Sequence, residues 1–167
     1  MTKIKYFAYG SNMLTSRLKA RVPSAEPVAV ASLEGHTLRF HKSSTDGSGK
    51  GDAYETGNPD DLVWGVVFEL DEVEKGLLDR VEGLGYGYEE KTVELEMRNG
   101  ERMEAVTYYA TNIDEELLPY EWYKDLVLYG AKEHGLPEHH IEYIESIESK
   151  KDLKESRREE NRSLLPS

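Results

Sequence analysis

The order of hydrophobic and polar positions in this 167-residue chain predicts both strands and helices. The most apolar stretch, residues 62–70, predicts a strand buried on both faces. Residues 92–97 and 102–110 are predicted to form two further strands, because Asn99 and Gly100 between them are typical of a tight hairpin turn. Shorter apolar runs predict additional strands over residues 4–9, 28–33 and 36–41.

A helix is predicted over residues 71–83. Asp71 is a suitable N-cap, and Glu74 three residues later completes the pattern of a capping box. Gly83 supplies the C-terminal stop. The buried stripe of this helix is expected at four apolar positions, namely Val73, Leu77, Leu78 and Val81.

Other helices are predicted over residues 15–20, 120–134 and 138–149. In the second of these, Gly135 is the stop, and the apolar face is expected to contain Trp122, Leu126 and Tyr129. Residues 43–61 are rich in Ser, Gly, Asp and Asn, which predicts a long loop that is functional or mobile.

The length of the chain fits one domain with a single core. Residues 1–149 are expected to form that domain, because no internal repeat or linker interrupts them. Residues 150–167 carry many charges and are expected to form a fraying C-terminal tail.

The chain is acidic, with 33 Asp and Glu against 21 Lys and Arg and a formal net charge of −12. Such a surface repels phosphate backbones, which argues against a nucleic-acid partner. The sequence has no Cys, which excludes disulfides, a thiol nucleophile and a Cys-based metal site. No signal-peptide pattern or transmembrane-length apolar run is present, so we expect a cytoplasmic protein with no membrane partner.

On local sequence evidence, Glu82 is the strongest candidate for a catalytic residue. It occupies the last turn of the helix over residues 71–83, where unpaired carbonyl groups carry partial negative charge. A carboxylate is disfavoured there and should keep its proton longer than a free Glu, which suits proton transfer near neutral pH. The alternative interpretation is an ordinary solvated carboxylate at a helix end.

The loop that follows the first strand is a second candidate. In Gly10, Ser11 and Asn12, successive N–H groups can converge on a carboxylate or phosphate, but the same residue types are typical of ordinary turns. Eleven Tyr against three Phe suit a pocket for a small polar ligand, with one or two of the tyrosines lining it.

Two other patterns do not indicate bound groups. Residues 46–51 (DGSGKG) resemble a phosphate-binding P-loop, but Ser44 and Gly51 stand where Gly and Ser or Thr are required. We therefore interpret this segment as a surface loop. The five His residues lack the spacing of a metal site and are interpreted as surface or structural side chains.

Four motifs and one tyrosine, in order along most of the chain, resemble the gamma-glutamylcyclotransferase family. They are Tyr6–Met13 (YFAYGSNM), Val63–Val67 (VWGVV), Glu82–Gly83 (EG), Tyr123 and Gly130–Pro137 (GAKEHGLP). The specific part of the resemblance is the Tyr-Gly-Ser-Asn loop combined with the downstream Glu-Gly pair.

The resemblance implies an α+β fold, a small mixed and mostly antiparallel β-barrel flanked by helices. It implies release of 5-oxoproline from a small-molecule gamma-glutamyl substrate, as in glutathione metabolism, with Glu82 as catalytic acid/base and no metal or cofactor. The resemblance does not decide whether the leaving group is an amino acid or an amine, or whether the protein forms a homodimer. A non-catalytic small-ligand-binding or interaction module on the same fold is the alternative function. The implied substrate-binding residues are Tyr6, Phe7, Ala8, Tyr9, Gly10, Ser11, Asn12 and Tyr123.

Overall fold

The computed structural model describes residues 2–165. Within them, five strands close into a barrel in the order β1-β5-β2-β6-β7. Neighbouring strands pair antiparallel, and a parallel contact between Tyr6 of β1 and Val106 of β7 completes the closure. The barrel strands are β1 (Lys3–Ala8), β2 (Glu26–Glu34), β5 (Leu62–Asp71), β6 (Tyr88–Met97) and β7 (Arg102–Ala110).

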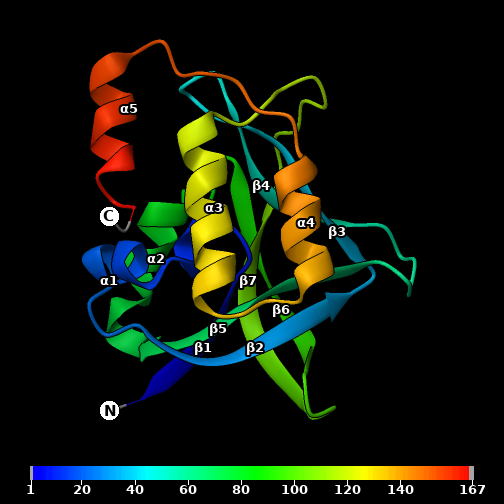
Figure 1. Ribbon diagram of the computed structural model, residues 1–167. Helices are drawn as coiled ribbons and strands as arrows, with labels where there is room; N and C mark the ends of the chain where they lie inside the picture. The colour runs from blue at the N-terminus through cyan, green and yellow to red at the C-terminus, as the bar shows by residue number, and fades with distance from the viewer. Residues whose placement is uncertain (1, 166–167) are drawn as a thin grey trace.

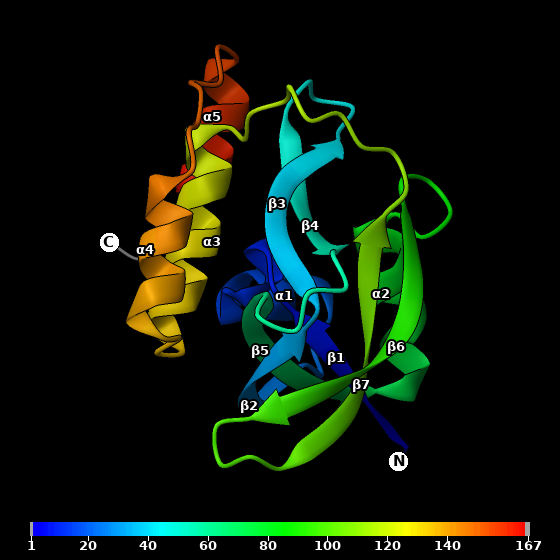
Figure 2. The ribbon, with the colours of Figure 1, turned by 90° about the vertical axis from the view of Figure 1, so that its right-hand side faces the viewer.

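Two further strands, β3 (His36–Ser43) and β4 (Gly49–Glu55), form a separate antiparallel hairpin that rises from the barrel (Figure 2). The helices α3 and α4 lie side by side along one flank, with α5 beside α3 (Figure 1). The predicted α+β barrel with flanking helices is therefore confirmed. The α-helices of residues 2–165 are α1 (Thr15–Arg21), α2 (Lys75–Glu82), α3 (Glu121–Glu133), α4 (Glu138–Ser146) and α5 (Glu155–Arg162).

Strand β5 is the centre of the barrel core, because it pairs with both β1 and β2. Its residues Val63 and Phe68 have no exposed surface, which confirms a strand that is buried on both faces. A Cβ at Gly65 would lie 2.4 Å from the carbonyl oxygen of Ala8 and 2.7 Å from the Phe7 ring. Only Gly lets β1 and β5 pack this closely.

The other predicted strands and helices form with small shifts at their ends. The largest extension is in β6, which begins at Tyr88 rather than at residue 92. The predicted stops are also confirmed, since Gly83 and Gly135 both follow helices with positive φ.

The prediction of a long loop over residues 43–61 was wrong in its middle, where β4 forms. A Cβ at Gly49 would lie 2.0 Å from the carbonyl oxygen of Phe40, so Gly is required for the pairing of β3 with β4. Asp52 is buried, where it shares a 2.7 Å hydrogen bond with His41 and accepts one of 2.8 Å from the N–H of Ala110. Strand β4 therefore has the composition of a loop for two reasons. Its Gly residues permit close backbone packing, and its buried Asp has hydrogen-bond partners.

The predicted capping box at the start of α2 does not form. Asp71 ends β5 and pairs with Lys3, whereas the Glu74 carboxylate accepts a 2.8 Å hydrogen bond from the N–H of Ser24. A 3-10 turn over Glu72–Glu74 then leads into α2. Both acidic side chains bind other parts of the chain because the strand continues to Asp71.

Only part of the predicted stripe on α2 is buried. Leu78 has no exposed surface, but Val73 is 79% exposed and Leu77 is 39% exposed. Val73 lies within the 3-10 turn, which winds more tightly than an α-helix, so it does not share a face with Leu78 in α2. Val81 is partly buried and lines a cavity described below.

Helix α3 buries a slightly different face from the one predicted. Trp122 and Leu126 are buried, but Tyr129 is 42% exposed. The buried face instead includes Gly130, where a Cβ would lie 2.7 Å from the backbone nitrogen of Leu14 and 2.8 Å from the Cβ of Met13. The helix therefore rests directly on the 3-10 turn after β1, Ser11–Met13.

The expectation of a fraying tail was wrong for residues 150–165; residues 166–167 lie outside the described part. Asp152 is 1% exposed and accepts a 2.9 Å hydrogen bond from the indole N–H of Trp122. Arg157 donates two hydrogen bonds to the same carboxylate, of 2.6 and 2.7 Å. One buried acidic group thus fixes the segment that leads into α5. The division at Ser149 into domain and tail stays a prediction.

Gly130→Ala is expected to lower the free energy of unfolding by about 1–3 kcal/mol, the range for overpacking a close contact. The added methyl group would push α3 away from the turn that follows β1. As a control, Gly76→Ala adds the same methyl group to α2 with no atom within 4 Å. This control should raise the free energy of unfolding by about 0.4–1 kcal/mol. Denaturant unfolding measures both changes, and equal effects would contradict the packing argument.

Candidate active site

A cavity of about 220 Å³ lies at the junction of the barrel, the β3–β4 hairpin and helices α1 to α3. It contains seven of the nine site residues predicted from the sequence. Phe7 and Ala8 do not line it. Phe7 is fully buried in the barrel, on the opposite side of β1 from Tyr6, because successive side chains of a strand alternate. The residues brought together are Tyr6, Tyr9, Gly10, Ser11, Asn12, Glu82 and Tyr123.

The Glu82 carboxylate is held by the strand and turn at the start of the chain. Its Oε1 accepts a 2.5 Å hydrogen bond from the Tyr6 hydroxyl and a 2.8 Å hydrogen bond from the Asn12 amide. Gly83 follows with φ of 74°, so the chain leaves α2 directly after the carboxylate. No donor within residues 2–165 binds Oε2, and this oxygen is therefore available to a ligand.

Burial raises the pKa of Glu82 above its ordinary value. The hydrogen bonds from Tyr6 and Asn12 and the charges of Arg21 and Arg17 lower this pKa, but they do not outweigh burial. The direction predicted from the sequence is confirmed, although the largest cause is the loss of solvent and not the helix end.

Tyrosine hydroxyls fix much of the cavity wall. The peptide of Gly51 is bound on both sides, because its N–H donates to the Tyr123 hydroxyl at 3.0 Å and its carbonyl accepts from Tyr88 at 2.5 Å. A Cβ at Gly10 or Gly51 would lie only 3.2 Å from the Tyr123 hydroxyl. More tyrosines line the cavity than the one or two expected, namely Tyr6, Tyr9, Tyr88, Tyr108 and Tyr123.

The loop after β1 offers unpaired donors to this cavity. The N–H groups of Gly10 and Ser11 have no acceptor in the described part of the chain. Beside them, the buried Arg17 donates from Nε to the Ser11 hydroxyl at 3.2 Å. Burial lowers the pKa of Arg17 to about 10, so its guanidinium stays charged at neutral pH. This side of the cavity suits an anion.

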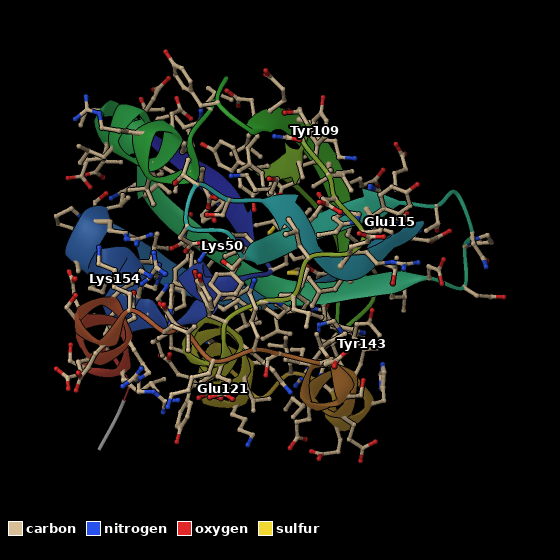
Figure 3. The ribbon with its side chains drawn as sticks, turned by 90° about the horizontal axis from the view of Figure 1, so that it is seen from above. Lys50, Tyr109, Glu115, Glu121, Tyr143 and Lys154 are labelled. Atoms are coloured by element: carbon tan, nitrogen blue, oxygen red, sulfur yellow. The ribbon has the colours of Figure 1, made fainter. Side chains whose placement is uncertain are left out.

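Sequence analysis missed the basic residues of the cavity. Four of them line it within residues 2–165, although the whole chain is strongly acidic. Arg17 and Arg21 are four residues apart, one helical turn, directly after the loop, and this spacing was a usable signal. Lys42 and Lys50 had no such signal, because they lie on two different strands, β3 and β4, and only the pairing of these strands brings both to the cavity. Figure 3 shows Lys50 near the centre of the molecule.

Lys50 is bound within the protein. Its ammonium pairs with Asp46 at 3.0 Å and lies over the rings of Trp122 and Tyr123, 4.4 and 4.5 Å from their centroids. Tyr120 donates to the carbonyl of Asp46 at 2.6 Å. Lys50 therefore connects this wall of the cavity to the start of α3.

Four of the five histidines have structural surroundings, and the fifth, His139, is exposed. His36, His41 and His140 are buried, and His134 forms a 2.9 Å hydrogen bond with the carbonyl of Met13. Across residues 2–165, no three or more His, Asp or Glu side chains are grouped so as to hold a metal ion. In the same range, no helix has the length and apolar character needed to cross a bilayer.

Comparison with known proteins identifies the family. Residues 62–145 match the AIG2-like family. The chain is 37% identical to the gamma-glutamylcyclotransferases of Bos taurus, over 149 residues, and Homo sapiens, over 147 residues; each match covers 86% of this chain and 78% of the relative. A solved gamma-glutamyl cyclotransferase structure is similar with a TM-score of 0.83 and 32% identity, covering 95% of this chain and 99% of that one. The chain therefore belongs to the gamma-glutamylcyclotransferase family.

Proposed function

We propose that this protein is a gamma-glutamylcyclotransferase that releases 5-oxoproline from gamma-glutamyl amides, with Glu82 as the catalytic acid/base. The observation that carries the proposal is the setting of Glu82. Its carboxylate is held through one oxygen by Tyr6 and Asn12, has a raised pKa, and lines a small polar cavity. Membership of the family supports the same assignment.

In the reaction, the substrate supplies its own nucleophile. Its alpha-amine attacks the gamma-carbonyl carbon, so a new C–N bond closes a five-membered ring while the C–N bond to the leaving amine breaks. Because both reacting groups belong to one molecule, the main task of the protein is to hold the folded conformer of the substrate. A cavity of about 220 Å³ restricts a small molecule in this way.

Glu82 would move the proton. Oε2 takes a proton from the substrate ammonium, which frees the amine to attack, and then gives this proton to the departing nitrogen. After ring closure the ring nitrogen still carries one proton more than 5-oxoproline does, and the released amine takes it up and leaves as an ammonium ion. A carboxyl group with a raised pKa can both accept and return a proton near neutral pH. The hydrogen bonds to Oε1 keep the carboxylate in one orientation throughout.

The positive side of the cavity would bind the glutamyl end. The N–H groups of Gly10 and Ser11 and the guanidinium of Arg17 fit the alpha-carboxylate of the substrate and also the oxyanion that develops on the gamma-carbonyl. Tyr9 and Tyr123 form part of the wall against which this end would pack.

The proposal includes a cytoplasmic site of action and catalysis without a metal or cofactor, on substrates that include those of glutathione metabolism. Its support is the acidic, Cys-free sequence and a reaction that needs only proton transfer and positioning.

Glu82→Gln is expected to lower the turnover number by about 10²–10⁴-fold, the usual contribution of a general acid–base group. The variant should still fold and bind substrate, because the Gln oxygen can accept the hydrogen bonds from Tyr6 and Asn12. Release of 5-oxoproline measures turnover, and calorimetric titration measures binding. The matched control is Glu89→Gln on the exposed face of β6, which should retain full activity. An active and folded Glu82→Gln protein would eliminate the proposed role.

The same variant should be more stable than the wild type at pH 7. A raised pKa means that folding makes ionisation of Glu82 harder, so ionised Glu82 lowers stability at neutral pH. The difference should shrink as the pH falls toward the ordinary pKa of Glu, about 4.3, below which the residue is protonated in both states. Thermal unfolding across this pH range measures the effect, and a pH-independent difference would contradict it.

A panel of gamma-glutamyl dipeptides, gamma-glutamyl amines and glutathione tests the activity directly. We expect 5-oxoproline from at least one of these classes. If none of them yields product, the fold serves here as a non-catalytic ligand-binding or interaction module.

A further inference from the structure

Lys42 lines the cavity without an anionic partner. Within residues 2–165 its ammonium makes no ion pair, whereas Lys50 on the neighbouring strand is paired with Asp46. The chain has twelve more acidic than basic residues, so the lack of an ion pair to Lys42 does not reflect a shortage of carboxylates. The ammonium of Lys42 faces the cavity without an ion-pair partner, so it is available to an anionic group of a bound ligand.

The position of Lys42 is fixed by other means. A Cβ at Gly87 would lie 2.8 Å from Cε and 3.0 Å from Nζ of Lys42, so the backbone of Gly87 packs directly against the end of this side chain. Gly87 has φ of 120°, which favours Gly at this position. The ammonium also lies 5.0 Å from the ring centroid of Tyr88. These contacts hold the charge in place without neutralising it.

Burial adds a reason to expect a ligand anion. Lys42 is partly buried, and burial lowers the pKa of its ammonium; the charges of Asp46 and Glu82, neither of which forms an ion pair with Lys42, raise this pKa but do not outweigh burial. Removing a charge from water without a partner costs free energy, and a bound carboxylate would recover it. The arrangement is unfavourable for the empty protein and favourable for a complex with an anion.

The two ends of a gamma-glutamyl substrate have different charges. The glutamyl end carries its alpha-amine and alpha-carboxylate on one carbon, so this carboxylate must lie near Glu82, which handles the amine. Arg17 of α1 donates to the Ser11 hydroxyl, beside Asn12, which holds Glu82, so Arg17 lies on that side. Lys42 comes from β3, in the hairpin, and is left for the other end of the substrate.

We propose that Lys42 binds the carboxylate of the leaving amino acid and thereby selects gamma-glutamyl amino acids over gamma-glutamyl amines. In the amino acid substrates, this carboxylate is one carbon away from the departing nitrogen. In the amines it is missing, so the ammonium of Lys42 would stay unpaired in the complex. This inference rests on the proposed function, and it makes Lys42 a specificity-determining residue.

The test compares gamma-glutamylalanine with gamma-glutamylalaninamide, which have nearly the same shape but differ in the charge at the leaving end. We expect Lys42→Met to lower kcat/KM for gamma-glutamylalanine by about 10- to 100-fold, the range for one charge-assisted hydrogen bond. The value for gamma-glutamylalaninamide should change by less than about twofold, because that substrate makes no ion pair. Lys42→Arg keeps the charge and should keep the preference for the carboxylate.

Lys91→Met is the matched control. Lys91 also lies over a tyrosine ring, 5.2 Å from the centroid of Tyr109, but outside the cavity, so neither substrate should be affected. Thermal unfolding checks that each variant folds, and Lys42→Gln replaces the Met variant if that one does not.

Two outcomes would overturn the inference in an active enzyme. Equal losses with both substrates would mean that Lys42 only shapes the cavity, and no loss with either would mean that it does not contact the substrate. A wild-type protein that makes no 5-oxoproline from either compound but makes it from another substrate of the panel would overturn the specificity assigned to Lys42 alone. No product from the whole panel would instead contradict the proposed function, and the specificity would be rejected with it.

Discussion

The site depends on one contact between distant parts of the chain, the hydrogen bond from the Tyr6 hydroxyl to the Glu82 carboxylate. It joins the first barrel strand to the end of α2 across 76 positions of sequence, and Asn12 reinforces it from the turn that follows β1. Without these donors, a partly buried carboxylate at the end of a helix would be free to rotate toward solvent. With them, one oxygen is occupied and the other is directed by the protein.

Glycines bring the elements close enough for this contact. Gly65 lets β5 pack against β1, and Gly130 lets α3 rest on the turn that carries Asn12. Gly51 allows Tyr123 to reach the peptide of β4. At Gly65 and Gly130 a single methyl group would push the backbones apart, and at Gly51 it would crowd the Tyr123 hydroxyl. The shape of the cavity therefore depends on close backbone packing as well as on the side chains that line it.

The barrel strands and most helices could be predicted because their apolar residues follow the periods of strands and helices. Strand β4 could not, since Gly49, Gly51 and the buried Asp52 have the composition of a loop. The capping box at Asp71 failed for a related reason: its acidic side chains have partners elsewhere in the fold. The pattern of residues within one segment does not show which distant side chains will bind it or how closely another backbone will pack against it.

For the site, Glu82 and the loop at Gly10 and Ser11 could be identified from two short motifs. Arg17, Lys42 and Tyr88 were missed as members of the cavity, because their value lies in where the fold places them. Lys42 has no local signal at all. Its meaning follows only from its place in the cavity and from the lack of an ion pair to it among residues 2–165, which are properties of the assembled structure.

The burial of Asp152 gives the last part of the chain a role in finishing the cavity wall. Asp152 holds the indole of Trp122, against which Lys50 packs, and Arg157 contacts the hydroxyl of Tyr120, which in turn binds the carbonyl of Asp46. A ribosome makes these residues after every other part of the site. This wall of the cavity is therefore the last part of the site that the nascent protein can complete.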